Sequence, residues 1–303
     1  VNEYGVFSLS DEKIVAGETE EEVYHSLGLS WIPPEIRENR GELELAAQGI
    51  VPDLIEQKDI RGDLHLHTHE SDGQFSLEEA IFHAEALGYE YLAITDHSIS
   101  LSVARGLDAK RLQLQMKQID DWNRKKGVSH RVHLLKGCEV NIKADGSLDL
   151  PEELLLQLDI VIAAVHSHMN MPAEEMTERI IRAISRPCVH LLAHPTGRIL
   201  LQREPFAMDM EKILETAARH GVAMELNAYP ARLDLNDIHC RSAAERGVGI
   251  AINTDSHSPK HLAFMRNGIF QARRGHLQKD QVLNTRTLAD LLSVLDRRKK
   301  RRQ

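Results

Sequence analysis

Residues 63–68 read Asp-Leu-His-Leu-His-Thr, and this stretch sets the interpretation of the chain. Leucines alternate with polar residues, which is the period-two pattern of a β-strand. Side chains two residues apart on a strand point to the same face, so the imidazoles of His65 and His67 can reach one ion. An isolated His-X-His pair is a weak signal, because a single strand-end histidine is more often a hydrogen-bonded structural residue. The other predicted strands must decide whether this pair belongs to a metal site.

Seven short segments have the composition of buried strands, and helical segments separate most of them. We predict strands at 63–67, 91–95, 133–140, 159–166, 189–194, 222–227 and 249–254. One helix has both ends marked: Ser76 and Glu79 form a capping box and Gly88 supplies a left-handed end, which predicts a helix over 77–87. This alternation predicts an α/β protein, either a barrel with one strand fewer than the usual eight or an open doubly wound sheet.

Metal-capable side chains recur where the predicted strands end. They are His65, His67, Asp72, Asp96, His97, Glu139, His166, His168, His194, Asp255 and His257. Because the carboxyl ends of parallel strands meet at one edge, we expect these groups to lie close together. The chain has 17 histidines, but chance placement does not explain five strand ends with a histidine and a sixth with Glu139. The sequence therefore predicts a clustered metal site.

The composition is that of a globular protein. The 303 residues are 42% hydrophobic and 27% charged, enough for two ordinary domains or one large barrel. No apolar run approaches the ~18 residues of a membrane helix, and no signal-peptide pattern is present, so we expect a cytoplasmic protein without a membrane partner. Three cysteines without a Cys-X-X-Cys pair argue against a disulfide framework and a thiolate zinc site.

Charge is distributed unevenly along the chain. The net charge of −9 argues against a protein that coats nucleic acid, yet residues 297–302 are all Arg or Lys. That basic tail is either a solvated terminus or a contact for a nucleic-acid backbone, and the sequence leaves both interpretations open. An acidic cleft repels phosphate unless cations neutralise it, which is compatible with phosphate chemistry by a protein that carries its own metal.

In their order along the chain, the strand-end motifs resemble those of the PHP (polymerase and histidinol phosphatase) domain. The matching segments are Asp63-Leu-His-Leu-His-Thr68, Thr95-Asp-His97, Gly137-Cys-Glu139, His166-Ser-His168, His194-Pro-Thr-Gly-Arg198 and Asn253-Thr-Asp-Ser-His257. The form is most similar to the C-terminal PHP domain of bacterial family X DNA polymerases. The resemblance implies a distorted seven-stranded (βα)7 TIM-like barrel.

The N-terminal residues agree with this resemblance. The segments Asn2-Glu-Tyr-Gly5 and Leu29-Ser-Trp-Ile-Pro-Pro-Glu-Ile-Arg-Glu38 look like the last part of a family X polymerase core. The resemblance implies a core remnant at 1–47, a linker at 48–58, the PHP domain at 59–290, and a helix end with the basic tail at 291–303. The catalytic aspartates of such polymerases have no counterpart here, so we expect no DNA polymerisation by this chain, either as a fragment or as a shortened gene product.

The resemblance also implies three divalent metal ions. The first would be held by His65, His67, Glu139 and Asp255, the second by Glu139 as a bridge with His166 and His194, and the third by Asp72, His97 and His257. Imidazole and carboxylate suit Mn²⁺ and Zn²⁺ similarly, so the sequence leaves the metal open.

Roles other than direct metal binding are implied for three further residues. Arg198 would neutralise phosphate oxygens through a bidentate fork, and His168 would hydrogen-bond the phosphate or the leaving group. Asp96 would orient a ligand histidine. Strand-end hydrogen bonding for His168 and capping for Asp96 are equally acceptable alternatives.

This ligand set predicts phosphoester hydrolysis. Two cations about 3.5–4 Å apart lower the pKa of bound water and stabilise the attacking and leaving oxygens. The leading hypothesis is a metal-dependent 3′-to-5′ exonuclease or DNA-end phosphoesterase acting in repair on single-stranded or gapped 3′ ends. The alternatives are a phosphatase of a small phosphomonoester and a non-catalytic polymerase-associated module. The complete ligand set counts against the last of these.

Overall fold

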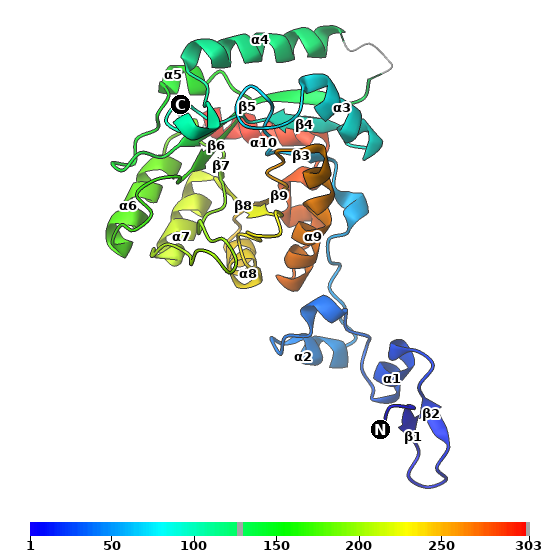
Figure 1. The fold of residues 1–303 in the computed structure, drawn as a ribbon. Coiled ribbons are helices and arrows are strands. Elements are labelled where there is room, and N and C mark those ends of the chain that lie inside the picture. The colour runs from blue at the N-terminus through cyan, green and yellow to red at the C-terminus, as the bar shows by residue number, and fades with distance from the viewer. Residues whose placement is uncertain (126–129, 301–303) are drawn as a thin grey trace. The chain divides into compact units, whose positions relative to one another are not determined.

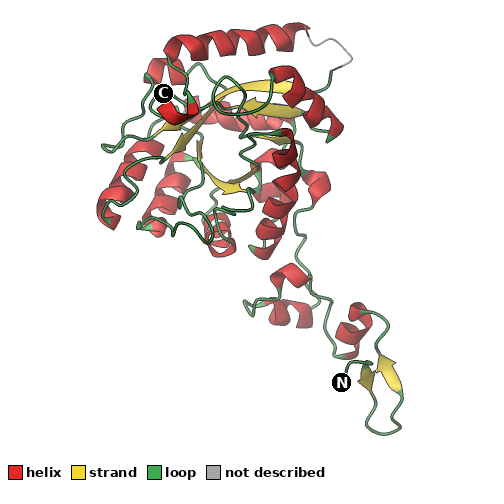
Figure 2. Ribbon diagram, viewed as in Figure 1, coloured by secondary structure: helices red, strands yellow, loops and turns green. Residues whose placement is uncertain are grey.

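The computed structural model describes residues 1–125 and 130–300, which form two compact units that divide between Leu54 and Ile55. The first unit pairs strands β1 (Val6–Phe7) and β2 (Ile14–Ala16), followed by α1 (Glu20–Ser26), the 3-10 helix η1 (Pro34–Ile36) and α2 (Glu42–Ala47). Ile32, Ile36, Ala46 and Leu54 form its small core. Figure 2 shows its helices and strands in separate colours.

The second unit contains one sheet of seven parallel strands, paired in chain order. These are β3 (Gly62–Asp63), β4 (Tyr91–Ile94), β5 (His133–Asn141), β6 (Ile160–Ala164), β7 (Leu191–Leu192), β8 (Ala223–Asn227) and β9 (Ile250–Asn253). The first and last strands meet just past their ends, where the His67 amide donates to the Ser256 carbonyl oxygen at 2.9 Å. The ring is therefore nearly closed (Figure 1), which confirms the barrel and excludes the open sheet.

Helices surround the ring (Figure 1). They are α3 (Leu77–Ala86), α4 (Ala109–Lys125), α5 (Glu152–Leu155), α6 (Ala173–Ile184), α7 (Met210–His220), α8 (Asp237–Glu245) and α9 (Met265–Arg274). Short 3-10 helices are η2 (Gln57–Asp59), η3 (Ser102–Ala104), η4 (Pro259–Phe264), η5 (Lys279–Gln281) and η6 (Leu283–Thr285). The capping box of Ser76 and Glu79 on α3 is confirmed. No helix among the described residues is long and apolar enough to cross a membrane.

The inward-facing side chains change character along the strands. Near the strand starts they are apolar and pack together inside the ring, as Leu135 and Ala223 do. Side chains of a strand alternate between its two faces, so later residues on the same inner face are Glu139 of β5 and Glu225 of β8. The carboxyl end of the barrel is therefore lined by polar groups, and the amino end is filled with hydrocarbon.

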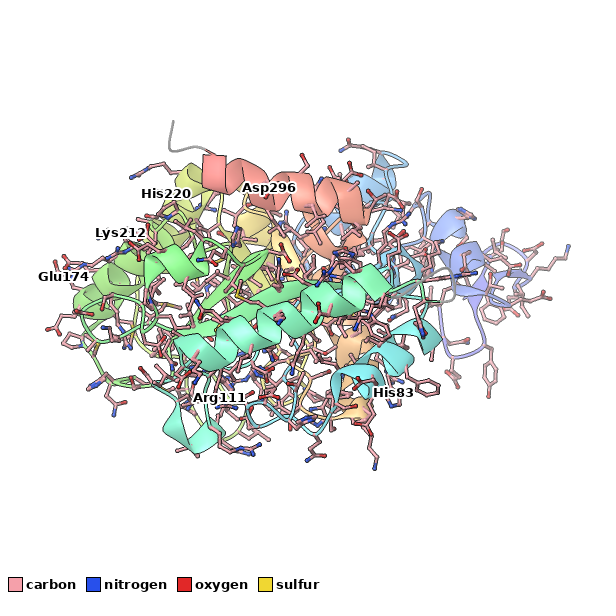
Figure 3. All side chains as sticks on the ribbon, turned by 90° about the horizontal axis from the view of Figure 1, so that it is seen from above. His83, Arg111, Glu174, Lys212, His220 and Asp296 are labelled. Carbon is pink, nitrogen blue, oxygen red and sulfur yellow. The ribbon has the colours of Figure 1, made fainter. Side chains whose placement is uncertain are left out.

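The last helix, α10 (Leu288–Lys300), closes the apolar end of the ring. Its Leu291 and Leu295 join the inner core cluster, at 0% and 3% exposed. The side chains of the basic tail at 297–302 lie outside the described residues. Charged residues labelled in Figure 3, such as Glu174 of α6 and Lys212 of α7, are exposed on the helical layer. The polar end of the barrel, by contrast, holds buried charged groups such as Glu139 and Glu225.

Candidate metal centre

The nine predicted metal ligands form one cluster at the carboxyl end of the barrel. Each has a nitrogen-to-oxygen contact of 4.0 Å or less with another member. The members are His65, His67, Asp72, His97, Glu139, His166, His194, Asp255 and His257. They come from the ends of six strands and from the loop after the first, so no stretch of sequence contains more than a few of them.

Glu139 of β5 lies at the middle of this cluster and is 1% exposed. Its Oε1 is 3.3 Å from His166 Nε2 and 3.0 Å from His194 Nε2. Its Oε2 is 3.5 Å from Nε2 of both His65 and His67. The two carboxylate oxygens thus face two different pairs of histidines.

The group around Glu139 Oε2 has the spacing of a metal coordination shell. Nε2 of His65 lies 3.1 Å from Nε2 of His67, and Asp255 Oδ1 lies 3.6 Å and 3.1 Å from these two nitrogens. Ligand atoms around a tetrahedral ion with bonds of about 2.0–2.1 Å lie about 3.3 Å apart. In the metal-free state one of the two nitrogens can donate to the other at 3.1 Å, and with both deprotonated the same spacing suits a shared cation.

A third group lies closer to solvent. Asp72 Oδ1 is 3.4 Å from His257 Nε2, and Asp72 Oδ2 is 3.6 Å from His97 Nε2. The side chains of Asp72 and His257 are 35% and 30% exposed, whereas that of Asp255 is 9% exposed. The His97 ring lies between groups, because its Nδ1 is 2.8 Å from Glu139 Oε2. The open side of the centre is therefore the side of Asp72 and His257.

Unpartnered polar atoms indicate that the cluster is built for cations. Among the described residues, His67 Nδ1 is buried without a hydrogen-bond partner, and His97 Nδ1 and Glu139 Oε2 face each other at 2.8 Å without the geometry of a hydrogen bond. Leaving such groups unsatisfied costs about 1–3 kcal/mol each, and more when they are charged. Other ring nitrogens are held from outside: His166 Nδ1 contacts Asn141 Oδ1 at 2.5 Å, and His257 Nδ1 contacts the Asp255 carbonyl at 2.8 Å. Their Nε2 atoms are left to face the cluster, as in metal sites.

Glu225 of β8 is a buried part of the centre that our sequence analysis missed. It is 0% exposed and accepts from His65 Nδ1 at 2.7 Å, from the His194 amide at 2.7 Å, and from the side-chain amides of Asn227 and Asn253. Because a carboxylate only accepts, His65 donates from Nδ1, and Nε2 is the ring nitrogen that faces the cluster. A usable signal was present: a carboxylate two residues before a strand end, between apolar neighbours Met224 and Leu226.

Asp96 orients a loop rather than a ligand histidine. Its carboxylate accepts from the Thr68 amide and hydroxyl at 2.8 Å and 2.6 Å, from the Ser71 hydroxyl, and from Gln115 Nε2. These bonds hold the turn that carries Asp72. The capping alternative for Asp96 is therefore closer to the observed contacts.

The structure does not bring His168 and Arg198 into the cluster. His168 is exposed. Among the described residues, its side chain forms no hydrogen bond or ion pair with the cluster. Arg198 donates from Nε to the Arg232 carbonyl at 2.8 Å and from Nη2 to the Leu233 carbonyl. Two guanidinium nitrogens of Arg198 thus hold the loop after β8, which leaves the bidentate phosphate contact predicted for it without support from the geometry.

Two of the predicted ligands have unusual backbone conformations. His194 and Asp255 have φ angles of 27° and 51°, in the left-handed region that non-glycine residues seldom adopt. Such residues cost of order 1–3 kcal/mol and gather at functional sites, where the surrounding structure holds them. Here the backbone turns so that both side chains point into the cluster.

Proximity within the cluster shifts several pKa values. Burial and the charges of His257 and His97 lower the pKa of His67 to about 3, so His67 is neutral in the metal-free state. Burial also lowers that of His257, but contacts with Asp72 and Asp255 outweigh it and raise its pKa to about 9. Although burial raises it, the surrounding histidines hold the pKa of Glu139 well below its usual range. Glu139 is thus ionised at neutral pH.

The buried carboxyl group of Asp234, beside the centre, makes the unfolding free energy of the chain depend on pH. Burial outweighs its hydrogen bond from the Thr196 amide and raises its pKa from 3.8 to about 6. Between these values the native state binds more protons than the unfolded chain, so the unfolding free energy falls as pH rises through this window. Asp234→Asn keeps an acceptor for Thr196 and should remove this fall, worth at most about 3 kcal/mol. Urea unfolding between pH 4 and 7 measures it, and a parallel pH profile in the variant would contradict this assignment.

Comparisons with known proteins agree with the two-unit organisation. The DNA polymerase beta thumb model matches residues 1–38, and the PHP domain model matches residues 63–229. The chain is 42% identical over 297 residues to the DNA polymerase/3′-5′ exonuclease PolX of Bacillus subtilis (strain 168), covering 98% of this chain and 51% of that protein. It therefore spans about half the length of this relative.

Other relatives match about three quarters of the chain or less. A probable phosphatase of Thermoanaerobacter sp. (strain X514) is 30% identical over 235 residues, which cover 74% of this chain and 89% of that protein. The crystal structure of histidinol phosphate phosphatase from Lactococcus lactis, complexed with zinc, L-histidinol and phosphate, superposes with a TM-score of 0.50 at 16% identity, covering 70% of this chain and 93% of that one. The PHP domain model matches more than half of the residues of this chain, and the strand-end motifs lie on one barrel in the expected order. This chain therefore belongs to the PHP domain family.

Proposed function

We propose that this chain is a metal-dependent phosphoesterase that removes nucleotides from DNA 3′ ends. The observation that carries the proposal is the position of Glu139, whose two oxygens face separate histidine pairs at 3.0–3.5 Å. A carboxylate placed in this way is suited to bridge two cations. The DNA substrate class is supported by 42% identity, over 98% of the chain, to a protein named as a DNA polymerase and 3′-5′ exonuclease.

Three ions would be held by the nine clustered side chains. His65, His67, Asp255 and Glu139 would hold the first, and Glu139, His166 and His194 the second. Asp72, His97 and His257 would hold the third. Bound Mn²⁺ or Zn²⁺ would lower the pKa of coordinated water and stabilise phosphoryl oxygens during ester cleavage. The mixed imidazole and carboxylate set suits either metal.

The chain's own residues define how a substrate approaches this centre. Nearly complete burial of His65, His67 and Glu139 excludes bulk water from the inner groups, at 0–1% exposed. Asp72 and His257 are about one-third exposed, so an ester phosphate enters from their side. Glu225 holds His65, and Asp96 holds the loop of Asp72, so both faces of the centre are oriented before substrate binds.

A second candidate function is hydrolysis of a small phosphomonoester. Sequence identity of 30% over 235 residues to a probable phosphatase favours it, because the match covers 89% of that protein. The same metal centre would serve either reaction, so product analysis must separate them.

The test is a substrate panel for protein loaded with Mn²⁺ or Zn²⁺. A 5′-labelled single strand, an oligonucleotide with a 3′-phosphate, and histidinol phosphate should each be incubated with and without chelator. A chelator-sensitive ladder of shortened strands is the expected result. Release of inorganic phosphate from histidinol phosphate alone would favour the second function, and no product from any substrate would refute both.

The number of protons released when the protein is loaded with metal should report the binding of the third ion. Because His257 has a pKa of about 9 and binds metal only when neutral, loading its group displaces a proton at pH 7. Calorimetric titration with Mn²⁺ in buffers of different ionisation enthalpy measures the protons released. His257→Gln is expected to bind one ion fewer and to release about one proton fewer than the unsubstituted chain. Equal ion counts in the two proteins would remove His257 from the ligand set.

A further inference from the structure

Three arginines gather beside the centre although the chain as a whole is acidic. Arg198 and Arg203 follow β7, and Arg232 follows β8. The two loops are joined through the Leu200 amide, which donates to the Ala231 carbonyl at 2.6 Å, and through Arg198, which donates to the Arg232 and Leu233 carbonyls. Arg203 donates from Nε to the Gly197 carbonyl at 2.8 Å. Two of the three guanidinium groups are therefore committed to the loop backbone.

Arg232 differs from the other two. Among the described residues its Nη1 is buried without a hydrogen-bond partner, while its side chain as a whole is 20% exposed. Its Nε lies 3.7 Å from Asp255 Oδ2, on the side of that carboxylate away from His65 and His67. A buried guanidinium nitrogen without an acceptor is costly, and its natural complement is an anionic oxygen.

The electrostatics of the cluster place this charge close to the ligands. After burial, the positive charge of Arg232 is the largest influence lowering the pKa of His194. Asp255 is its only ion-pair partner among the described residues, and this carboxylate also faces the ligand group of His65 and His67 through Oδ1. A cation held by that group would share the negative charge of Asp255. The positive charge of Arg232 would then be only partly neutralised by Asp255 and could attract a second anion.

We propose that Arg232 binds a non-bridging oxygen of the substrate's phosphoryl group, and that Arg198 is a positioning residue that holds the Arg232 loop. This deepens the proposed function, on which it rests, by naming the contact that recognises an anionic phosphoester. A guanidinium stays charged at all working pH values and presents several donors in a fixed fork, so the partly exposed side chain can offer a donor to the phosphoryl oxygen while Nε faces Asp255.

The experiment compares Arg232→Gln, Arg232→Lys and Arg246→Gln in the metal-loaded full chain. Arg246 is the control because it is an exposed arginine at the end of α8, paired with Glu211. Elemental analysis gives the metal content, and calorimetry with inorganic phosphate gives the affinity. Arg232→Gln should keep its metal and weaken phosphate binding about tenfold or more, as expected for a charged hydrogen bond. Arg232→Lys should fall between, and Arg246→Gln should match the unsubstituted chain.

Chemical rescue of Arg232→Ala and a substitution of Arg198 separate contact from positioning. Added guanidinium ions at low concentration should restore part of the DNA hydrolysis lost in Arg232→Ala, because a free cation can occupy the vacated space. Arg198→Gln should lower both phosphate affinity and the thermal midpoint, since it removes two bonds to the loop backbone.

Each remaining outcome decides between the two proposals. Unchanged phosphate affinity in Arg232→Gln would overturn the Arg232 contact, and so would loss of metal ions, which would make Arg232 a counter-ion of Asp255 only. If Arg232→Gln loses phosphate affinity but the unsubstituted chain hydrolyses none of the three substrates, the contact stands and the proposed function fails.

Discussion

Glu139→Gln is expected to lower phosphoester turnover roughly a thousandfold while the barrel remains folded. A neutral amide cannot supply two anionic oxygens, so the facing pairs His65/His67 and His166/His194 lose their shared acceptor. Loss of a group that acts as a unit with others typically removes most of the rate enhancement. Steady-state hydrolysis of labelled DNA, together with elemental analysis, measures the effect, and the bound metal should fall by at least one ion.

The matched control is Glu153→Gln, which makes the same chemical change at an exposed position on α5. It should retain full turnover and metal content. Circular dichroism of both variants should equal that of the unsubstituted chain, because Glu139 lies above the apolar core rather than within it. Near-normal turnover by a folded Glu139→Gln protein would contradict the bridging role of Glu139.

Glu225→Gln should weaken metal binding about 10- to 100-fold without removing any ligand. The Glu225 carboxylate accepts from four donors, and a glutamine would direct its own amide hydrogens at two of them. His65 would lose the acceptor that fixes which ring nitrogen carries the proton. The metal-free variant should also be less stable by about 2–5 kcal/mol, because buried donors lose a charged partner.

Competition with a chelating dye gives the metal affinity, and urea unfolding of metal-free protein gives the stability. Glu225→Asp is the second variant, because it retains the charge but shortens the reach to His65. Glu245→Gln, on the exposed surface of α8, is the control. If metal affinity in Glu225→Gln equalled that of the unsubstituted chain, Glu225 would have no part in orienting His65.

Much of the barrel could be predicted because its signals are local. All seven predicted strands form parallel strands in chain order, and the predicted helix over 77–87 is observed as Leu77–Ala86. The strands β3 and β7 are shorter than predicted, with two residues each. At both places the chain continues past the regular ladder to form the centre: Leu66 pairs with Ser256, and His194 adopts its left-handed conformation. Strand propensity does not report where a ladder ends, because that depends on the neighbouring strand.

Arg198 and Glu225 show the limit of motif reasoning at the site. The motif around Arg198 indicates a residue near phosphate, but its guanidinium donates to carbonyls of residues 34 and 35 positions later in the chain. Glu225 lies 160 positions from His65, whose ring it holds. These hydrogen-bond partners depend on how two loops or two strands pack against each other, and a local sequence pattern contains no information about that packing.

By itself, the amino-acid sequence determined the kinds of ligand, their placement at strand ends and the parallel α/β architecture, because each follows from short-range periodicity and side-chain chemistry. Only the tertiary structure decided that the ring closes through Ser256 and that Glu139 faces two histidine pairs. It also decided that Arg232, beside the centre, has a buried nitrogen without a hydrogen-bond partner among the described residues. These properties depend on distances between residues far apart in sequence, and packing sets those distances once strands from the whole chain share one barrel end.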